Sequence, residues 1–162
     1  MIEKERKFMV KSKKFILLSH KMINIKQGYL SKDKNLSVRI RISDKNSHLC
    51  IKGPSSKSGI SRFELEKKIS LLEGRKLLKL CLPRVISKKR YLIEYKNQLF
   101  EVDVFEGFLK GLILAEIELN SESQQISLPD WVGEEVTGIT SFYNSQLSKF
   151  TDREVNDLIN LY

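Results

Sequence analysis

Charged and apolar residues alternate along most of this chain, and the alternation limits what it can fold into. In Val38-Arg39-Ile40-Arg41-Ile42 the arginines share one side and the aliphatic residues the other. Successive side chains of a β-strand point to opposite faces, so this period indicates strands. The pattern predicts strands at 2–9, 26–30, 36–43, 47–52, 60–69, 88–95, 98–106 and 111–120. Several connections are short and rich in turn residues, so we expect antiparallel pairing.

Helices are predicted in the remaining segments. Residues 12–22 and 140–149 are each expected to form one. Ser70 and Glu73 have the spacing of a capping box before an apolar stripe, and Thr151 and Glu154 repeat it before a short C-terminal helix within 151–161. Nothing in the composition suggests a linker, so we predict a single α+β domain over residues 1–162.

Composition narrows the function classes. The 29 basic and 20 acidic residues give a formal charge of +9, which favours an anionic partner such as nucleic acid, a membrane surface or a phosphate compound. We find neither a membrane-length apolar stretch nor a signal peptide and expect a cytoplasmic protein. Cys50 and Cys81 do not have zinc-site spacing, so any metal is expected to be a hard cation held by carboxylates.

The charged faces of the strands carry both signs. They hold eight carboxylates and seven cations: Glu3, Glu5, Glu64, Glu66, Glu101, Asp103, Glu116 and Glu118, with Lys7, Arg39, Arg41, Lys52, Arg62, Lys88 and Arg90. A solvated face with cross-strand ion pairs is one interpretation. Exposed pairs contribute only about 0–1 kcal/mol each, so stability is a poor reason for such density. The alternative is a barrel with a charged interior that holds a metal-bound polyphosphate.

Several segments resemble one known family. Glu3-Lys4-Glu5-Arg6-Lys7 matches the ExExK signature of the CYTH superfamily, also called the triphosphate tunnel metalloenzymes. Eight further groups of residues resemble family segments in the same order, among them Gln27-Gly28-Tyr29, Arg62-Phe63-Glu64-Leu65-Glu66 and Ala115-Glu116-Ile117-Glu118. The resemblance covers about residues 1–150 and is greatest to small bacterial single-domain members.

The resemblance implies a closed, eight-stranded antiparallel tunnel with helices packed outside, and one or two Mg²⁺ or Mn²⁺ ions. The positions that it matches to metal ligands are Glu3, Glu5, Asp103, Glu116 and Glu118. The positions matched to triphosphate binding are Lys7, Arg39, Arg41, Lys52, Arg62, Lys88 and Arg90. It implies catalytic roles for Glu5, Lys88, Arg90 and Glu118, and leaves Tyr29, Glu64 and Glu66 as additional candidates.

The chain also departs from the family pattern. After Gly138 the family usually has a polar residue and a basic-Tyr pair, whereas here Ile139 to Tyr143 follow. A contact of the C-terminal region with the tunnel mouth is therefore left open. Cys50 stands where a threonine is common, which we interpret as a packing variation.

The functional hypothesis is hydrolysis of the terminal phosphoryl group of inorganic tripolyphosphate or a related triphosphate. The alternatives are a class IV-type adenylate cyclase, a thiamine triphosphatase, and a non-catalytic module that binds polyphosphate or RNA. An outer basic patch of Lys11, Lys13, Lys14, Lys21, Lys32 and Lys34 could serve the last of these, but we favour a solvated surface and do not expect nucleic-acid binding. A monomer and a homodimer are both compatible with the sequence.

Overall fold

The computed structural model describes residues 2–33 and 36–161, so Lys34 of the predicted basic patch lies outside the described residues. The strands are β1 (Ile2–Val10), β2 (Lys21–Lys32), β3 (Ser37–Ser43), β4 (Asn46–Ser55), β5 (Ser61–Ile69), β6 (Ile86–Tyr95), β7 (Gln98–Phe105), β8 (Ile113–Glu118) and β9 (Val132–Glu135). The helices are α1 (Phe15–Leu18), α2 (Leu71–Lys79), α3 (Asn144–Leu147) and α4 (Asp152–Asn160), with 3₁₀ turns η1 (Gly107–Leu109) and η2 (Thr140–Phe142).

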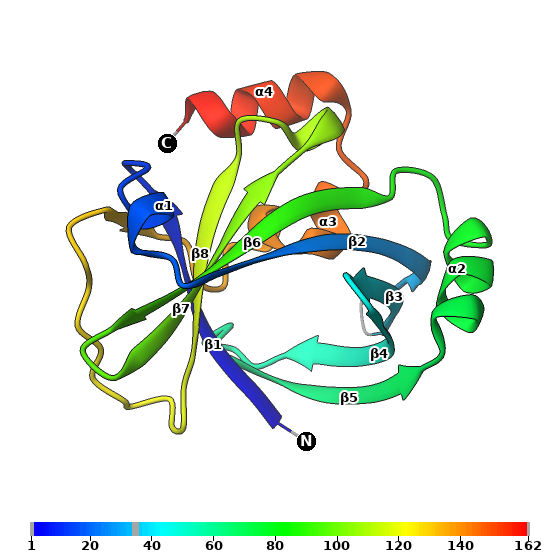
Figure 1. Ribbon diagram of the computed structural model, residues 1–162, viewed down its shortest axis with the longest axis horizontal. Helices are drawn as coiled ribbons and strands as arrows, with labels where there is room; N and C mark the ends of the chain where they lie inside the picture. Colours follow the sequence, from blue (N-terminus) through cyan, green and yellow to red (C-terminus); the bar gives the residue numbers. More distant parts are fainter. Residues whose placement is uncertain (1, 34–35, 162) are drawn as a thin grey trace.

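Strands β1 to β8 close into an antiparallel barrel, as predicted (Figure 1). The strand order is β5-β4-β3-β2-β6-β7-β8-β1, and β1 then pairs with β5 to complete the ring. Strand β1 pairs with two neighbours along its length: Ile2 to Lys4 pair with β5, and Glu5 to Met9 pair with β8. Closure satisfies the backbone groups that an open sheet would leave at its edges.

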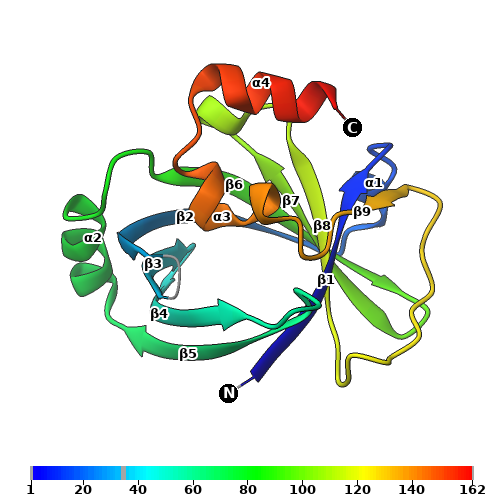
Figure 2. The same ribbon diagram turned by 180° about the vertical axis from the view of Figure 1, so that it is seen from behind.

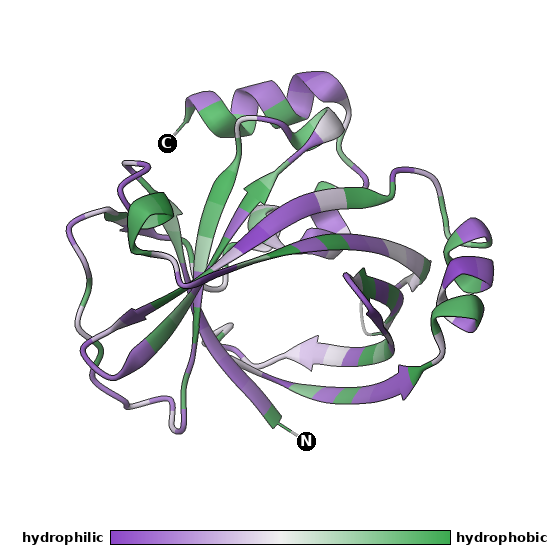
Figure 3. Cartoon of the chain, viewed as in Figure 1, coloured by the Kyte–Doolittle hydropathy of each residue, from purple (hydrophilic) through white to green (hydrophobic). Residues whose placement is uncertain are grey.

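A ninth strand, β9, adds to β1 outside the ring. It was not predicted, because its four residues are too few to show a period. Alternation was informative where strands are longer, and Figure 3 shows hydrophilic and hydrophobic residues in bands along β5. In a closed barrel, each band points either into the tunnel or outward.

The predicted helix at 12–22 is correct only in part. Only Phe15–Leu18 is α-helical, and the chain enters β2 at Lys21. Strand β2 is therefore longer than the predicted 26–30, because residues 21–27 pair with β6 from Lys21 opposite Leu92 to Gln27 opposite Ile86. The Ser19 hydroxyl hydrogen-bonds to the carbonyl oxygens of Lys21 and Leu92 and fixes this entry. Long-range pairing thus overrides the local helical pattern.

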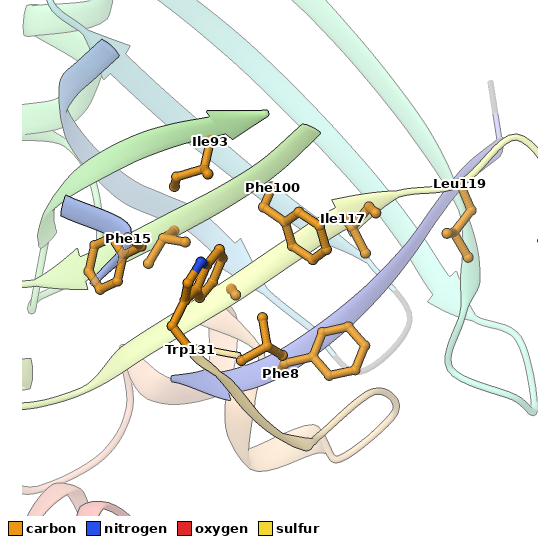
Figure 4. Close-up of a cluster of buried hydrophobic side chains, with 10 residues drawn as sticks. Phe8, Phe15, Ile93, Phe100, Ile117, Leu119 and Trp131 are labelled. Carbon is orange, nitrogen blue, oxygen red and sulfur yellow. The ribbon is translucent and has the colours of Figure 1, made fainter. Parts of the chain in front are cut away.

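Two apolar cores pack against β1, β6, β7 and β8, the first on the outer faces of these strands and the second on their inner faces, next to the charged residues. In the first, Trp131 lies against Phe15 and Phe100 (Figure 4). In the second, Leu109 and Leu114 pack with Val155 and Leu158 of α4. We call β1, β6, β7 and β8 the covered wall. The opposite side, β3, β4 and β5, is called the exposed wall because Phe63 and Leu65 remain 47% and 51% exposed.

Helices α2 and α4 begin at the two predicted capping boxes, at Ser70 and Thr151. Helix α4 lies over η1 and the turn between β7 and β8, whereas α2 flanks the exposed wall (Figure 2). Gly74 allows α2 to approach β4 closely, since a Cβ atom there would lie 1.9 Å from the Ser47 hydroxyl oxygen. None of the described helices is long and apolar enough to cross a membrane.

The predicted helix at 140–149 is correct only in part, because the segment divides into η2 and the single turn α3. The chain before it touches the β4–β5 hairpin. Gly59 and Gly138 both have positive φ, and a Cβ atom on Gly59 would lie 2.3 Å from the Gly138 Cα atom. This contact between two backbones requires glycine at both positions. It fixes α3 beside one mouth of the barrel.

Candidate active site

The barrel encloses a narrow, charged cavity of about 40 Å³. Side chains from all eight strands of the ring and from α3 line it. They are Glu3, Glu5, Ile25, Gln27, Arg39, Arg41, Lys52, Arg62, Lys88, Arg90, Glu101, Glu116, Glu118 and Asn144. The charged side chains that the alternation placed on one face thus converge inside the barrel.

The covered wall holds the most deeply buried ion pairs. Both oxygens of Asp103, a residue only 1% exposed, accept hydrogen bonds at 2.7 Å from the Arg90 guanidinium. Lys88 donates to the same carboxylate. Arg90 also contacts Glu101, and it donates to Glu116 at 2.9 Å. Such bidentate, charge-assisted bonds fix the guanidinium in one orientation.

A second group lies where β1 meets β5. Glu3 accepts from the Lys52 ammonium at 2.7 Å and from the Arg62 Nε atom at 2.7 Å. Arg62 reaches Glu5 at 3.4 Å. Because Glu3 and Arg62 are register partners across the closing pair of strands, closure of the barrel itself brings these charges together.

The exposed wall carries further ion pairs. Arg41 contacts Glu66 at 2.6 Å, and Arg39 lies 3.8 Å from Glu64. The predicted candidate Tyr29 hydrogen-bonds with Arg39. Burial raises the pKa of the Tyr29 hydroxyl, so Tyr29 is a neutral partner for this guanidinium.

Burial and charge act against each other on the pKa values. Burial lowers the pKa of Lys88 to about 8, and its contact with Asp103 offsets only part of that effect. For Glu116, burial alone would raise the pKa, but Lys7 and Arg90 outweigh it and hold the pKa well below the usual range. Lys7 lies 2.8 Å from Glu116. Both groups are therefore charged at neutral pH.

The residues fit a divalent cation where β1 and β8 pair. Glu5 and Glu118 are direct register partners, and so are Lys7 and Glu116. Two carboxylates facing each other across a strand pair destabilise a sheet unless a cation lies between them. Among the described residues, Glu118 has no ion-pair partner. The donor set, carboxylate oxygen with lysine and arginine nearby, suits Mg²⁺ or Mn²⁺ rather than a soft metal.

A different set of donors lies close together on the exposed wall. Within the described ranges, Cys50, Glu64 and Glu66 have one ligand atom each within 4.8 Å of the others. Their carboxylates already have cations, since Lys52 lies 3.0 Å from Glu64 and Arg41 contacts Glu66. The Cys50 thiol donates to Glu66 at 3.1 Å, and burial raises its pKa. These contacts satisfy the cluster without a metal.

All but two of the predicted metal- and phosphate-binding residues line the cavity, whereas the additional candidates Tyr29, Glu64 and Glu66 do not. Asp103 sits beneath Lys88 and Arg90, and Lys7 lies beside Glu116. The Tyr143 ring lies 5.9 Å from the Lys7 ammonium, so the C-terminal segment does contact the charged cluster. Sequence reasoning assigned no role to three lining residues, Ile25, Gln27 and Asn144, because they carry no charge. Continuing the alternation along β2 would have found the first two.

A closed barrel whose interior joins carboxylates to lysines and arginines defines a class of polyanion-binding tunnel proteins. The chain belongs to the CYTH family, since the CYTH domain model matches residues 1–152. An inorganic triphosphatase of Acetivibrio thermocellus is 41% identical over 91% of this chain and 93% of its own length. An inorganic triphosphatase of Nitrosomonas europaea is 34% identical over 91% of this chain and 97% of its own length.

Solved structures agree with this assignment. The crystal structure of an inorganic triphosphatase, 30% identical, superposes with a TM-score of 0.65 over 92% of this chain and 95% of that one. A putative adenylyl cyclase from Hippeastrum, 15% identical, has a TM-score of 0.60 over 74% of this chain and 80% of its own. At that identity the second likeness concerns the fold alone.

Proposed function

We propose that this protein is a divalent-metal-dependent triphosphatase that hydrolyses the terminal phosphoryl group of inorganic tripolyphosphate or a closely related triphosphate. The observation that carries the proposal is the convergence of lysines, arginines and carboxylates in one enclosed cavity. The two relatives named inorganic triphosphatase, which match nearly the whole chain, support the same reaction.

The charge balance of the tunnel supports a requirement for metal. Alternation identified seven cationic and eight carboxylate side chains, and the tunnel keeps this near balance, since six of the cations and five of the carboxylates line its cavity. Its cations are already paired with Glu3, Glu5 and Glu116. A triphosphate can bind there when divalent cations neutralise those carboxylates and leave the lysines and arginines to the phosphate oxygens.

We assign the roles accordingly. Glu3, Glu5, Glu116 and Glu118 hold the metal, and Asp103 orients Lys88 and Arg90 from behind as well as contributing negative charge. The six cations that line the cavity bind the phosphate oxygens and stabilise the charge of the transferring phosphoryl group, while Lys7 holds Glu116 in place from beside the cavity. A bound divalent metal polarises the phosphate and lowers the pKa of a coordinated water. Glu118, exposed and unpaired among described residues, accepts the proton of the attacking water.

The two cysteines bear on the cellular compartment in which the enzyme acts. Cys50 and Cys81 are both free, and free thiols are typical of proteins that work in a reducing compartment. We therefore propose that the enzyme acts in the cytoplasm, where phosphorylated small molecules are its potential substrates. The test is to isolate the protein under non-reducing conditions and to measure the oxidation state of its cysteines. We expect both thiols to be reduced.

The substrate assay separates the candidate reactions. The purified protein is incubated with Mg²⁺ or Mn²⁺ and with tripolyphosphate, ATP or thiamine triphosphate in parallel, and phosphate, diphosphate and cyclic AMP are quantified. We expect tripolyphosphate to give phosphate and diphosphate at the highest kcat/KM. Cyclic AMP as the main product from ATP would identify a cyclase, and binding without turnover would identify a non-catalytic module.

The metal assignment is tested by Glu5→Gln. Loss of one metal-binding carboxylate should remove several kcal/mol of transition-state stabilisation, so kcat should fall about 100-fold or more. The fold should persist, because the change is isosteric and relieves the opposition of Glu5 and Glu118. Glu106→Gln, at an ion pair with Lys89 outside the tunnel, is the matched control and should keep full activity. Wild-type turnover in Glu5→Gln would contradict the assignment.

A further inference from the structure

One strand of the barrel brings no charge to the cavity. Strand β2 lines it with Ile25 and Gln27, while its neighbours on either side, β3 and β6, each present two cations. Those cations are Arg39 and Arg41 on β3, and Lys88 and Arg90 on β6. The two groups of phosphate-binding candidates on this side of the tunnel are therefore separated by the width of β2, and Gln27 is the polar group between them.

The burial of Gln27 is unusual for a glutamine. The residue is 1% exposed, yet its Nε2 atom has no hydrogen-bond partner among the described residues. A buried amide that donates no hydrogen bond costs free energy, and an apolar side chain of the same length would avoid that cost. The amide therefore needs an explanation other than packing, and it lines the same cavity as the cations.

The strand register places Gln27 between the two cation groups. Gln27 is the direct partner of Arg41 across the β2–β3 pairing. Across the β2–β6 pairing its partner is Ile86, and Ile25 on the same side of β2 is the partner of Lys88. Lys88 is thus the diagonal neighbour of Gln27. A phosphate group held by Arg41 and Lys88 together must pass the amide of Gln27.

We propose that Gln27 is a substrate-binding residue whose Nε2 atom donates a hydrogen bond to a non-bridging oxygen of the triphosphate. This inference rests on the proposed function. A third cation at this position would face Arg41 and Lys88 with like charge, whereas an amide adds a donor without repulsion. Gln27 therefore fixes where the phosphate chain lies along the tunnel, and the flanking cations supply most of the affinity.

The test compares two variants of Gln27 with one of an exposed glutamine. Gln27→Met keeps the length and removes the donor, and we expect KM for tripolyphosphate to rise about tenfold, as for loss of a hydrogen bond to a charged group. Gln27→Glu places a carboxylate beside Arg41 and Lys88. It should keep or raise the melting temperature and raise KM further, to about 100-fold. Gln125→Met, in the exposed loop before β9, should match wild type.

The melting temperature and KM of the variants together decide the outcome. If Gln27 served only the fold, both variants would lower the melting temperature, and KM of the folded fraction would stay at the wild-type value. A wild-type KM in Gln27→Met overturns the inference. If Gln27→Met does not fold, a wild-type KM in Gln27→Glu overturns it equally.

Failure of the proposed function gives a different result. If wild type does not hydrolyse tripolyphosphate, the triphosphatase proposal falls. Calorimetric binding of tripolyphosphate in the presence of Mg²⁺ then still tests Gln27. Weaker binding by Gln27→Met and Gln27→Glu than by wild type supports the inference, and equal binding, or no binding by wild type, overturns it.

Discussion

The two walls of the barrel use the same kinds of ion pair in different surroundings. On the covered wall, Lys88 and Asp103 have the first apolar core on the other face of the sheet and the second beside them on their own face, and they are almost fully buried. On the exposed wall, Arg41 and Glu66 form a pair of similar length whose side chains are 23% and 32% exposed. The apolar residues packed around each pair, rather than the pair itself, therefore set how much water reaches each charge.

This difference has energetic and functional consequences. A buried pair is costly to break, because the charge that remains has neither a partner nor water. A pair open to water contributes little and can exchange partners readily. We infer that the covered wall holds its cations in fixed positions, whereas the cations of the exposed wall can leave their carboxylates when a polyanion enters the tunnel.

The largest difference should appear when the same aromatic residue is truncated on each wall. Phe100→Ala removes a fully buried ring beside Trp131 and should lower the free energy of unfolding by about 3–5 kcal/mol. Phe63→Ala removes a ring that is half exposed and should cost about 1 kcal/mol or less. Guanidinium unfolding of both variants measures the two values. Equal losses would show that the walls do not differ in packing.

The second comparison changes a carboxylate to an amide on each wall. Asp103→Asn leaves Lys88 and Arg90 without their main counter-charge and should destabilise the protein by about 3 kcal/mol. Glu66→Gln acts on a partly solvated pair and should cost less than about 1 kcal/mol. Urea unfolding at neutral pH compares them. A loss in Glu66→Gln as large as that in Asp103→Asn would contradict the distinction between the walls.

The smallest effect concerns the decline of the unfolding free energy at acidic pH. Burial would raise the pKa of Asp103, but Arg90 and Lys88 outweigh it and lower the pKa; Glu116 behaves alike. Unfolded carboxylates take up protons near pH 4, and these two do so only at lower pH. The unfolded state then binds more protons, so stability present above pH 4 is lost as the pH falls. The loss is roughly 1.4 kcal/mol per pH unit for each such group.

Urea unfolding at pH 7, 4 and 3 checks this dependence. The decline of the unfolding free energy below pH 4 should be shallower in Asp103→Asn, which lacks one of the two groups. The decline should be nearly unchanged in Glu66→Gln. Against the effect of burial, Arg41 lowers the pKa of the Glu66 carboxyl, but this side chain is partly exposed, so water screens the ion pair and little stability depends on its charge. An identical decline in wild type and Asp103→Asn would remove Asp103 from this account.

The strands could be predicted from their own residues because their signal is local, whereas closure into a barrel was predicted through the resemblance to the CYTH family. Alternation in segments such as Arg39 to Ile42 identifies a strand and its charged face without knowledge of the partner strand. The signal is weak at the start of β2, where pairing with β6 rather than pattern makes residues 21–25 extended. It is absent in β9, which needs β1 as a template. Strands that form through distant partners leave little trace in their own residues.

The charged residues of the site could be predicted from the sequence, whereas the contacts between them could not. The charged residues could be named because each stands on a recognisable strand face. Which acid meets which base depends on register between distant strands, as for Glu3 with Arg62 and Glu5 with Glu118. Gln27 and Asn144 were missed for another reason, because an uncharged residue in a charged tunnel stands out only when burial and partners are known.

Strand β1 has a consequence for the order of folding. The other neighbours in the ring are mostly hairpins, but β1 pairs with β5 and β8, and even its shorter connection, between Glu3 and Arg62, spans 59 residues. Closing such long loops costs entropy that only native contacts repay, so β1 is expected to dock late. Because β1 carries Glu3, Glu5 and Lys7, partly assembled intermediates would lack these groups, and catalytic competence would arise only in the final closure step.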